Sequence, residues 1–203
     1  MAFVPNSIIT LTTDFGLDDP FAGIMKGVIL TVNPDARIVD ITHGVPPHNI
    51  LAGAMALQSS YCYFPRGTIH LAVVDPGVGS SRRPLLAVSD HHAFVGPDNG
   101  LLSSLIQSQK GVRVFHLTEE AFFLKPVSQT FHGRDIFAPV AAWLSRGKAP
   151  ESFGKPIEDW VWLHWPGPHR SGKGLKGRVL RIDRFGNLIT NISLQDLSSR
   201  GAT

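Results

Sequence analysis

The chain has 203 residues, of which 43% are hydrophobic and 17% are charged. This length suits one substantial domain, or one domain with a smaller appendage, and the composition excludes wholesale disorder. The formal net charge of +3 is small for this length, so charge gives no reason to expect a nucleic-acid or membrane-surface partner. No apolar run approaches the roughly 20 residues of a membrane-spanning helix.

Cys62 is the only cysteine, which excludes an internal disulfide and a cysteine cluster for zinc. We expect its side chain to pack on a buried helix face. The N-terminus lacks the basic region and long apolar core of a signal peptide. Together these features favour a cytoplasmic location.

The first third of the chain alternates between strand and helix patterns. Strands are predicted over residues 7–13, 37–42 and 68–74. The first helix is predicted to begin at Pro20 with Asp19 as its N-cap, and the second covers residues 49–63. This alternation predicts an α/β fold with a largely parallel central sheet.

The next part of the chain adds a hairpin, a strand and two helices. Residues 85–88 and 93–95 form the hairpin, which turns at Asp90-His91-His92, so both histidines are expected at the surface. A helix follows Asn99-Gly100. A strand over 112–117 and a helix over 135–145 come next.

The last quarter of the chain has a different pattern. Residues 150–177 are rich in Pro, Gly and Trp and are predicted to be a connector. Residues 177–183 and 188–193 follow as a predicted hairpin. Because a lone hairpin is marginal in water, it indicates the start of a further β domain. The predicted organisation is an N-terminal α/β domain over 1–165, a linker over 166–176 and an incomplete C-terminal β domain over 177–203.

Polar residues follow four of the predicted strands. Asp14 ends the first strand, His43 follows the second, Asp75 ends the third, and Asp98-Asn99 follows the hairpin. Ordinary turn chemistry explains any one of them. In open α/β sheets, however, ligands bind beyond the carboxyl ends of the strands, so the four together predict a site.

The loop Asp75-Pro76-Gly77-Val78-Gly79-Ser80 is rich in glycine, yet it is not a phosphate-binding loop, because it lacks Gly-Lys-Ser/Thr and no helix pattern follows. Arg82 lies within reach of Asp75. The pair is either a surface salt bridge of little energetic value or an orienting pair in a site. His132 precedes a predicted helix start, and its participation requires that the fold bring it beside Asp75 and Arg82.

These segments, taken together, resemble the S-adenosylmethionine hydroxide adenosyltransferases, a family related to the fluorinases and chlorinases. The matching segments occur in family order and span nearly the whole chain: Thr13–Gly16 with Asp19, Met25–Val28, Ile38–His43, Val73–Gly79 with Arg82-Arg83, Gly96–Gly100, Thr130–Pro139, Ile182–Asn187 and Thr190–Ile192.

The resemblance implies an N-terminal α/β domain, a smaller β-barrel-like C-terminal domain and a homotrimer that binds S-adenosylmethionine between subunits. It implies a catalytic set of Asp75, Arg82 and His132. It also implies substrate-binding roles for Asp14, which would hold the ribose hydroxyls, for Asp183 and Asn187, which would hold the methionine amino end, and for Asp19, Asn99 and Phe131.

The implied reaction is the attack of water on the ribose C5′, which releases adenosine and methionine. The sulfonium leaves as a neutral thioether, so neither a general acid, a metal nor another cofactor is required, and one oriented water suffices. Arg82 stays protonated, so it cannot be the base, and its role is to position the water or Asp75. His132 or Asp75 takes the proton of the water.

Two alternatives remain at the level of sequence. The first is a halide-using relative, which carries Tyr and Ser where this chain has His132 and Gly133 and lacks the Asp-Pro-Gly-Val-Gly loop. The second is a module that binds adenosine or S-adenosylmethionine without turnover. The family's C-terminal domain is expected to continue past Thr203, so we expect weak substrate binding and slow turnover by the 203-residue chain.

Overall fold

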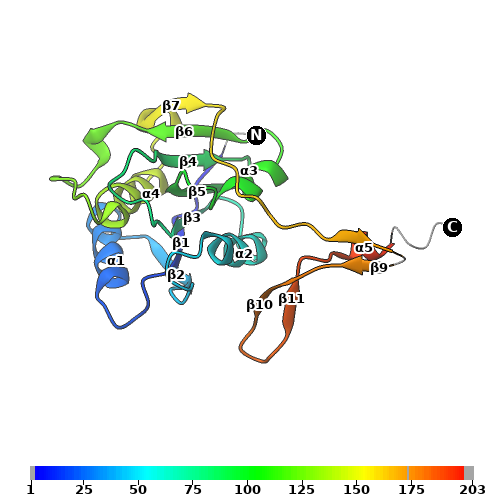
Figure 1. The fold of residues 1–203 in the computed structure, drawn as a ribbon. Helices are drawn as coiled ribbons and strands as arrows, with labels where there is room; N and C mark the ends of the chain where they lie inside the picture. Colours follow the sequence, from blue (N-terminus) through cyan, green and yellow to red (C-terminus); the bar gives the residue numbers. More distant parts are fainter. Residues whose placement is uncertain (1–2, 173, 199–203) are drawn as a thin grey trace. The chain divides into compact units, whose positions relative to one another are not determined.

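The computed structural model describes residues 3–172 and 174–198. The chain divides into two compact units, with the boundary between Leu163 and His164. In the larger unit, helices flank a central sheet (Figure 1), so the predicted α/β class is confirmed. Within the described residues, no helix is long and apolar enough to span a bilayer.

The central sheet has seven strands in the order β2-β1-β3-β5-β4-β6-β7. The strands β2, β1, β3 and β5 run parallel, whereas β4, β6 and β7 pair antiparallel. The carboxyl ends of the parallel strands therefore share one edge of the sheet. The bounds of the strands are Ile8–Thr13 (β1), Arg37–Thr42 (β2), Thr68–Val73 (β3), Pro84–Val88 (β4), His92–Pro97 (β5), Arg113–Leu117 (β6) and Gly154–Ile157 (β7).

The helices of the larger unit are Phe21–Val32 (α1), Ile50–Ser60 (α2), Ser103–Ser108 (α3) and Ala138–Ser145 (α4). Asn49 caps α2, since its side chain accepts a hydrogen bond of 3.0 Å from the Ala52 amide. The predicted cap of α1 is wrong. Pro20 occupies the N-cap position and makes no side-chain cap bond, while Asp19, one residue too early to cap, is exposed.

The strand residues alternate between two buried faces of the sheet. On one face, Ile9, Leu11 and Leu71 pack with Met25 of α1 and Val140 of α4 in one continuous core. On the other face, the side chain of Val74 packs against α2, where a Cβ at Gly53 would overlap it. The first face is thus apolar, whereas the second also buries polar side chains of the strands, among them Thr10, Thr12 and His70.

Three local predictions are wrong. His92 lies in β5 and is buried rather than exposed, because its ring packs against His70 and Phe94. Cys62 lies in a 3₁₀ turn after α2, Tyr61–Tyr63, and is exposed rather than packed. The predicted connector contributes β7, which pairs with β6 and completes the sheet.

The smaller unit consists of two antiparallel hairpins and a short helix. Its elements are His169–Ser171 (β8), Gly174–Lys176 (β9), Val179–Ile182 (β10), Leu188–Thr190 (β11) and Leu194–Ser198 (α5). The hairpin β10–β11 confirms the pair of strands that the sequence predicted on either side of residues 184–187. The expected linker over 166–176 carries the hairpin β8–β9, so part of it is regular structure.

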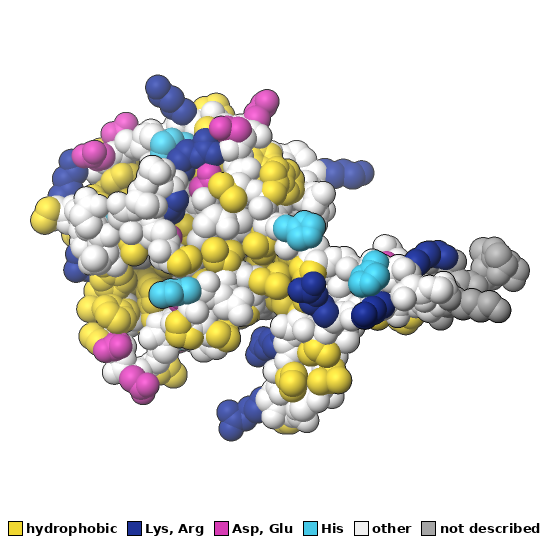
Figure 2. All heavy atoms as spheres, viewed as in Figure 1, with side chains coloured by type: hydrophobic (Ala, Val, Ile, Leu, Met, Phe, Trp, Pro, Cys, Tyr) yellow, Lys and Arg dark blue, Asp and Glu magenta, His cyan; other side chains and the backbone are white. Residues whose placement is uncertain are grey.

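Charged side chains are mixed on the surface of the larger unit. On the face that Figure 2 shows, basic and acidic groups lie among one another, without a broad area of one sign. Ion pairs such as Lys26–Asp40 and Lys125–Glu120 belong to this mixed surface. Exposed pairs of this kind contribute little to stability.

A buried histidine pair gives the fold an acid-sensitive element. His70 is fully buried; its Nδ1 lies 2.8 Å from Thr10 Oγ1 and its Nε2 lies 3.3 Å from His92 Nδ1. Burial, with His92 as the smaller cause, lowers the pKa of His70 to about 3. The unfolded chain, in which histidine titrates near about 6.5, therefore binds more protons between these two pH values.

We therefore expect the free energy of unfolding to fall as pH drops from about 6.5 towards 3, at up to roughly 1.4 kcal/mol per pH unit from this residue. His70→Gln removes this titration and flattens the dependence. Urea unfolding of both proteins at pH 7 and pH 5 measures it. Equal losses of stability in the two proteins would contradict the assignment to His70.

Candidate active site

The carboxyl edge of the parallel strands carries a loop that folds back on itself. This loop, Asp75–Arg82, follows β3. Backbone bonds from Val78 to Asp75 (3.2 Å) and from Ser80 to Gly77 (3.1 Å) close two successive turns within it. The Ser80 hydroxyl then accepts a hydrogen bond of 3.3 Å from the Arg82 amide. These turns return Arg82 to the side chain of Asp75.

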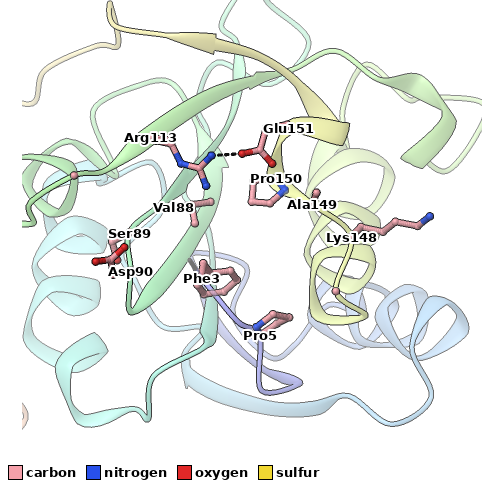
Figure 3. Close-up of a pocket in the computed structure, with 12 residues that line it drawn as sticks. Phe3, Pro5, Val88, Ser89, Asp90, Arg113, Lys148, Ala149, Pro150 and Glu151 are labelled. Atoms are coloured by element: carbon pink, nitrogen blue, oxygen red, sulfur yellow. Dashed lines mark hydrogen bonds and ion pairs between the residues drawn. The ribbon is translucent and has the colours of Figure 1, made fainter. Parts of the chain in front are cut away.

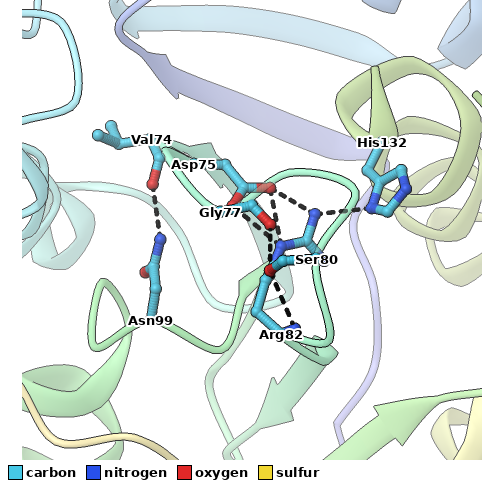
Figure 4. A network of polar contacts seen from close by, with 7 residues as sticks. All are labelled: Val74, Asp75, Gly77, Ser80, Arg82, Asn99 and His132. Atoms are coloured by element: carbon cyan, nitrogen blue, oxygen red, sulfur yellow. Dashed lines mark hydrogen bonds and ion pairs between the residues drawn. The ribbon is translucent and has the colours of Figure 1, made fainter. Parts of the chain in front are cut away.

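Asp75 and Arg82 form a buried, two-pronged ion pair (Figure 4). Arg82 Nε lies 2.9 Å from both carboxylate oxygens, and Nη2 donates to Oδ2. Their side chains are only 5% and 8% exposed, so the interpretation as a surface salt bridge is wrong. Arg82 Nη1 is buried without a hydrogen-bond partner among the described residues, which is the state of a donor that a ligand or water would satisfy.

His132 joins this pair from a segment 50 residues further along the chain. Arg82 Nη2 lies 2.7 Å from His132 Nδ1 (Figure 4). Because a guanidinium can only donate, Nδ1 is the acceptor, and the ring proton of neutral His132 is on Nε2. Burial and then the positive charge of Arg82 lower the pKa of His132, and the carboxylates of Asp75 and Asp135 oppose this less strongly. Arg82 thus contacts both of the other predicted catalytic residues, Asp75 and His132.

The segment that carries His132 is held by Asp135. This residue is fully buried within a π-helical turn, Gly133–Phe137, that precedes α4. Its Oδ2 accepts a hydrogen bond of 2.8 Å from the Ser128 amide, and Arg134 pairs with both of its oxygens. The carboxylate therefore ties the start of the loop to the turn, which leaves His132 little freedom.

A cleft of about 270 Å³ lies beside the catalytic set. Phe15, Phe21 and Phe131 form one side of it in edge-to-face contact, with ring centroids 5.3–5.9 Å apart. Asp14 is on the wall, and its Oδ2 accepts a hydrogen bond of 2.8 Å from the His48 amide. The cleft is lined by Asp14, Phe15, Phe21, Pro47, His48, Val73, Asp75, Val78, Thr130, Phe131, His132 and Gly133.

Two other predicted site residues of the larger unit, Asp19 and Asn99, do not line this cleft. Asp19 is exposed before α1. Asn99 uses both ends of its amide within the fold, donating to the Val74 carbonyl (2.8 Å) and accepting from the Leu101 amide (3.1 Å). In the smaller unit, Asp183 Oδ2 accepts a hydrogen bond of 2.7 Å from Asn187 Nδ2, and Oδ1 binds the amide of Asn187 at 2.8 Å.

His48 is a cleft residue that the sequence interpretation missed. It has a positive φ of 63°, which is uncommon for a residue other than glycine, and it supplies the amide that binds Asp14. A signal for it exists in the sequence. Pro47 ends the loop on one side, and Asn49 caps α2 on the other, so the intervening residue must complete a tight turn.

A second, larger cavity of about 550 Å³ lies elsewhere in the larger unit, beside the Arg113–Glu151 ion pair (Figure 3). Phe3, Val88 and Pro150 line it, and none of the predicted site residues does. Among the described residues, no cluster of three or more His, Cys, Asp or Glu side chains is arranged to hold a metal ion. The predicted site residues Asp14, Asp75, Phe131 and His132 instead line the smaller cleft, where Arg82 contacts Asp75 and His132.

An open α/β sheet with an aromatic and acidic cleft at the carboxyl ends of its strands defines a protein that binds a small molecule. Residues 9–154 match the family model of the SAM hydroxide adenosyltransferase N-terminal domain. The chain therefore belongs to the SAM hydroxide adenosyltransferase family.

Several known proteins are similar to this chain in sequence or in structure. The chain is 41% identical over 187 residues to the (R)-S-adenosyl-L-methionine hydrolase of Salinispora tropica, covering 91% of this chain and 71% of that protein. It is 25% identical over 223 residues to a fluorinase of Actinoplanes, covering 97% and 75%. The crystal structure of an uncharacterized conserved protein from Thermotoga maritima superposes with a TM-score of 0.87, at 37% identity, covering 97% of this chain and 75% of the other.

Proposed function

We propose that this protein is an enzyme that hydrolyses S-adenosyl-L-methionine to adenosine and L-methionine. The observation that carries the proposal is the buried contact of Asp75, Arg82 and His132 beside a cleft that also contains Asp14 and Phe131. Relatives at about 40% identity, which are named as hydrolases of this substrate, support the same reaction.

The proposed step is an in-line displacement at the ribose C5′. The water oxygen forms a bond to C5′ while the C5′–S bond breaks, and the bonding electron pair passes to sulfur. The leaving group changes from a sulfonium to the neutral thioether of methionine, so it needs no proton. The site must therefore orient one water and accept one proton, which requires neither a metal nor another cofactor.

The contacts favour Asp75 over His132 as the proton acceptor. His132 Nδ1 already accepts a hydrogen bond from Arg82, and Nε2 carries the ring proton. Asp75 has carboxylate lone pairs beyond those that Arg82 occupies, and it lines the cleft. In this proposal Asp75 takes the proton, Arg82 fixes the carboxylate, and His132 fixes Arg82. The negative charge of Asp75 also favours binding of the cationic substrate.

The substrate-binding roles follow the layout of the cleft. The Asp14 carboxylate would accept hydrogen bonds from the ribose hydroxyls, and Phe131 would contact the nucleoside. The Asp183–Asn187 hairpin of a neighbouring subunit in a homotrimer would contact the methionine amino end. Because Asp183 now accepts hydrogen bonds from Asn187, part of that loop's bonding would change when the amino group binds.

A product assay tests the reaction. We expect the protein, incubated with S-adenosylmethionine, to release adenosine and methionine in equal amounts, and chloride or fluoride to leave the products unchanged. Liquid chromatography of the reaction mixture measures both. Halogenated adenosine as the main product would favour the halide-using alternative, which the fluorinase relatives keep relevant.

The same assay distinguishes a binding module from an enzyme. A module would bind adenosine or S-adenosylmethionine in calorimetry and release neither product after prolonged incubation. The buried ion pair favours the enzyme, because it places a proton acceptor, held by Arg82 Nε and Nη2, at the wall of the cleft, and leaves Arg82 Nη1 as a donor for a ligand or water. Binding without any release of adenosine would overturn the proposed function.

A further inference from the structure

A second polar network lies behind the ribose side of the cleft. His43 is buried, and its Nδ1 lies 2.8 Å from the hydroxyl of Thr13, which is fully buried at the end of β1. On the other side of the ring, Nε2 lies 3.1 Å from Asp40 Oδ1. Asp40 in turn pairs with Lys26 of α1 at 2.6 Å. None of these four residues lines the cleft.

The charge of Asp40 sets the proton position of His43, whose Nε2 is buried close to that carboxylate but makes no hydrogen bond of good geometry among the described residues. Burial raises the pKa of Asp40, but the nearby Lys26 and His43 side chains lower it by more, so the group stays ionised. This carboxylate favours the ring proton on Nε2 of His43. Nδ1 then accepts the Thr13 hydroxyl proton, and the Thr13 oxygen accepts the Phe15 amide at 3.3 Å. Each donor in this chain of contacts therefore points from the loop after β1 towards Asp40 of β2.

This network joins the two loops that form the Asp14 side of the cleft. His43 binds the loop after β1 twice, through its ring to Thr13 and through its carbonyl to the Gly16 amide at 2.8 Å. The loop after β2 returns a third contact, from the Val45 amide to the Thr13 carbonyl at 3.3 Å. Asp14 lies between these anchors.

We propose that Thr13, His43 and Asp40 are positioning residues, which hold the Asp14 carboxylate in the orientation that receives the ribose hydroxyls of the substrate. The inference rests on the proposed function, because it gives Asp14 the role of ribose acceptor. Asp14 has one oxygen fixed by the His48 amide. The Thr13–His43 contact fixes the backbone next to Asp14. Losing this contact therefore weakens nucleoside binding more than it slows the attack of the water.

The test compares two threonines of the same strand. Thr13→Val removes the hydroxyl and keeps the shape of the side chain. Thr10→Val is the matched control, because Thr10 is also fully buried in β1 and its hydroxyl also lies 2.8 Å from a histidine Nδ1, that of His70, away from the cleft. Adenosine affinity is measured by calorimetry, KM and kcat by the product assay, and folding by thermal melting.

We expect both substitutions to lower the melting temperature, whereas only Thr13→Val raises the Kd for adenosine and the KM, by roughly tenfold, with a smaller change in kcat. Thr13→Ser, which restores the hydroxyl, recovers most of the affinity. Asp40→Asn, a change on the partly exposed strand β2, shifts KM in the same direction, because the His43 ring loses its preferred proton position.

The outcomes separate this inference from the proposed function. Equal adenosine affinity in wild type and Thr13→Val would overturn the positioning role, even if the wild type hydrolyses S-adenosylmethionine. Equal loss of affinity in Thr10→Val and Thr13→Val would assign the effect to general stability and overturn it as well. A wild type that binds adenosine, with the Thr13 dependence described, but releases none from S-adenosylmethionine would overturn the hydrolysis and leave the positioning role supported.

Discussion

Replacing Asp75 with Asn is expected to lower kcat for adenosine formation by about 10²–10⁴-fold, the usual contribution of a positioned proton acceptor. The amide has nearly the same shape, but it cannot take the proton from water. His132→Asn is expected to cost far less, because the Asn oxygen can accept the Arg82 hydrogen bond that Nδ1 now accepts. Single-turnover rates of adenosine release from S-adenosylmethionine measure both variants.

A second ion pair with a buried carboxylate, Asp98–Arg83, controls for damage to the fold, although Arg83 is 25% exposed and also binds Asp159. Asp75→Asn leaves the Arg82 charge uncompensated, and breaking a buried ion pair typically costs about 3–5 kcal/mol. Asp98→Asn breaks an Arg–Asp contact at the same edge, where Asp98 is 2% exposed and lies 2.7 Å from Arg83. The control should lose stability but keep most of its activity. If His132→Asn were as inactive as Asp75→Asn, the proton would instead be assigned to His132.

The fold was largely predictable because its information is local. The alternation of strand and helix patterns up to Val73 predicts parallel strands, and parallel strands bring Asp14 and Asp75 to one edge. The strand β7 was missed because Gly154–Ile157 is short and contains Pro156 and a glycine. Its strand character depends on pairing with β6 rather than on its own residues.

The site was predictable only in part, because its decisive contacts join distant segments. The contact of Arg82 with His132 depends on the turns after Asp75 and on the buried carboxylate of Asp135, and no spacing in the sequence encodes either. The hydrogen bond from Asn99 to the Val74 carbonyl likewise joins two distant segments, and no spacing in the sequence encodes it. Residue types indicated the chemistry here, whereas the packing of two loops decided which residues meet.

The Asp75–Arg82 loop and the segment that carries His132 meet at Gly79. We expect substitution of this glycine to have the second large effect on activity. Gly79 has a φ of 76°, a left-handed conformation that L side chains rarely adopt, and a Cβ at this position would overlap the Gln129 carbonyl oxygen. Gly79→Ala must therefore push the Asp75–Arg82 loop away from the segment that carries His132. We expect a loss of activity on the order of 10²-fold, since displacing catalytic groups by about 1 Å can cost that much.

Gly147→Ala separates the cost of the left-handed backbone conformation from the effect of the overlap with the Gln129 carbonyl. Gly147 has a similar φ of 83°, but a Cβ there meets open space, so its substitution carries only the cost of the left-handed conformation, roughly 1–2 kcal/mol. Thermal melting and adenosine release, measured on both variants, show whether activity follows stability. If the two glycines were equivalent in both measurements, close contact between the loops would not be needed for catalysis. Loss of activity confined to Gly79→Ala would instead mean that the reaction depends on Arg82 and His132 remaining within hydrogen-bond distance.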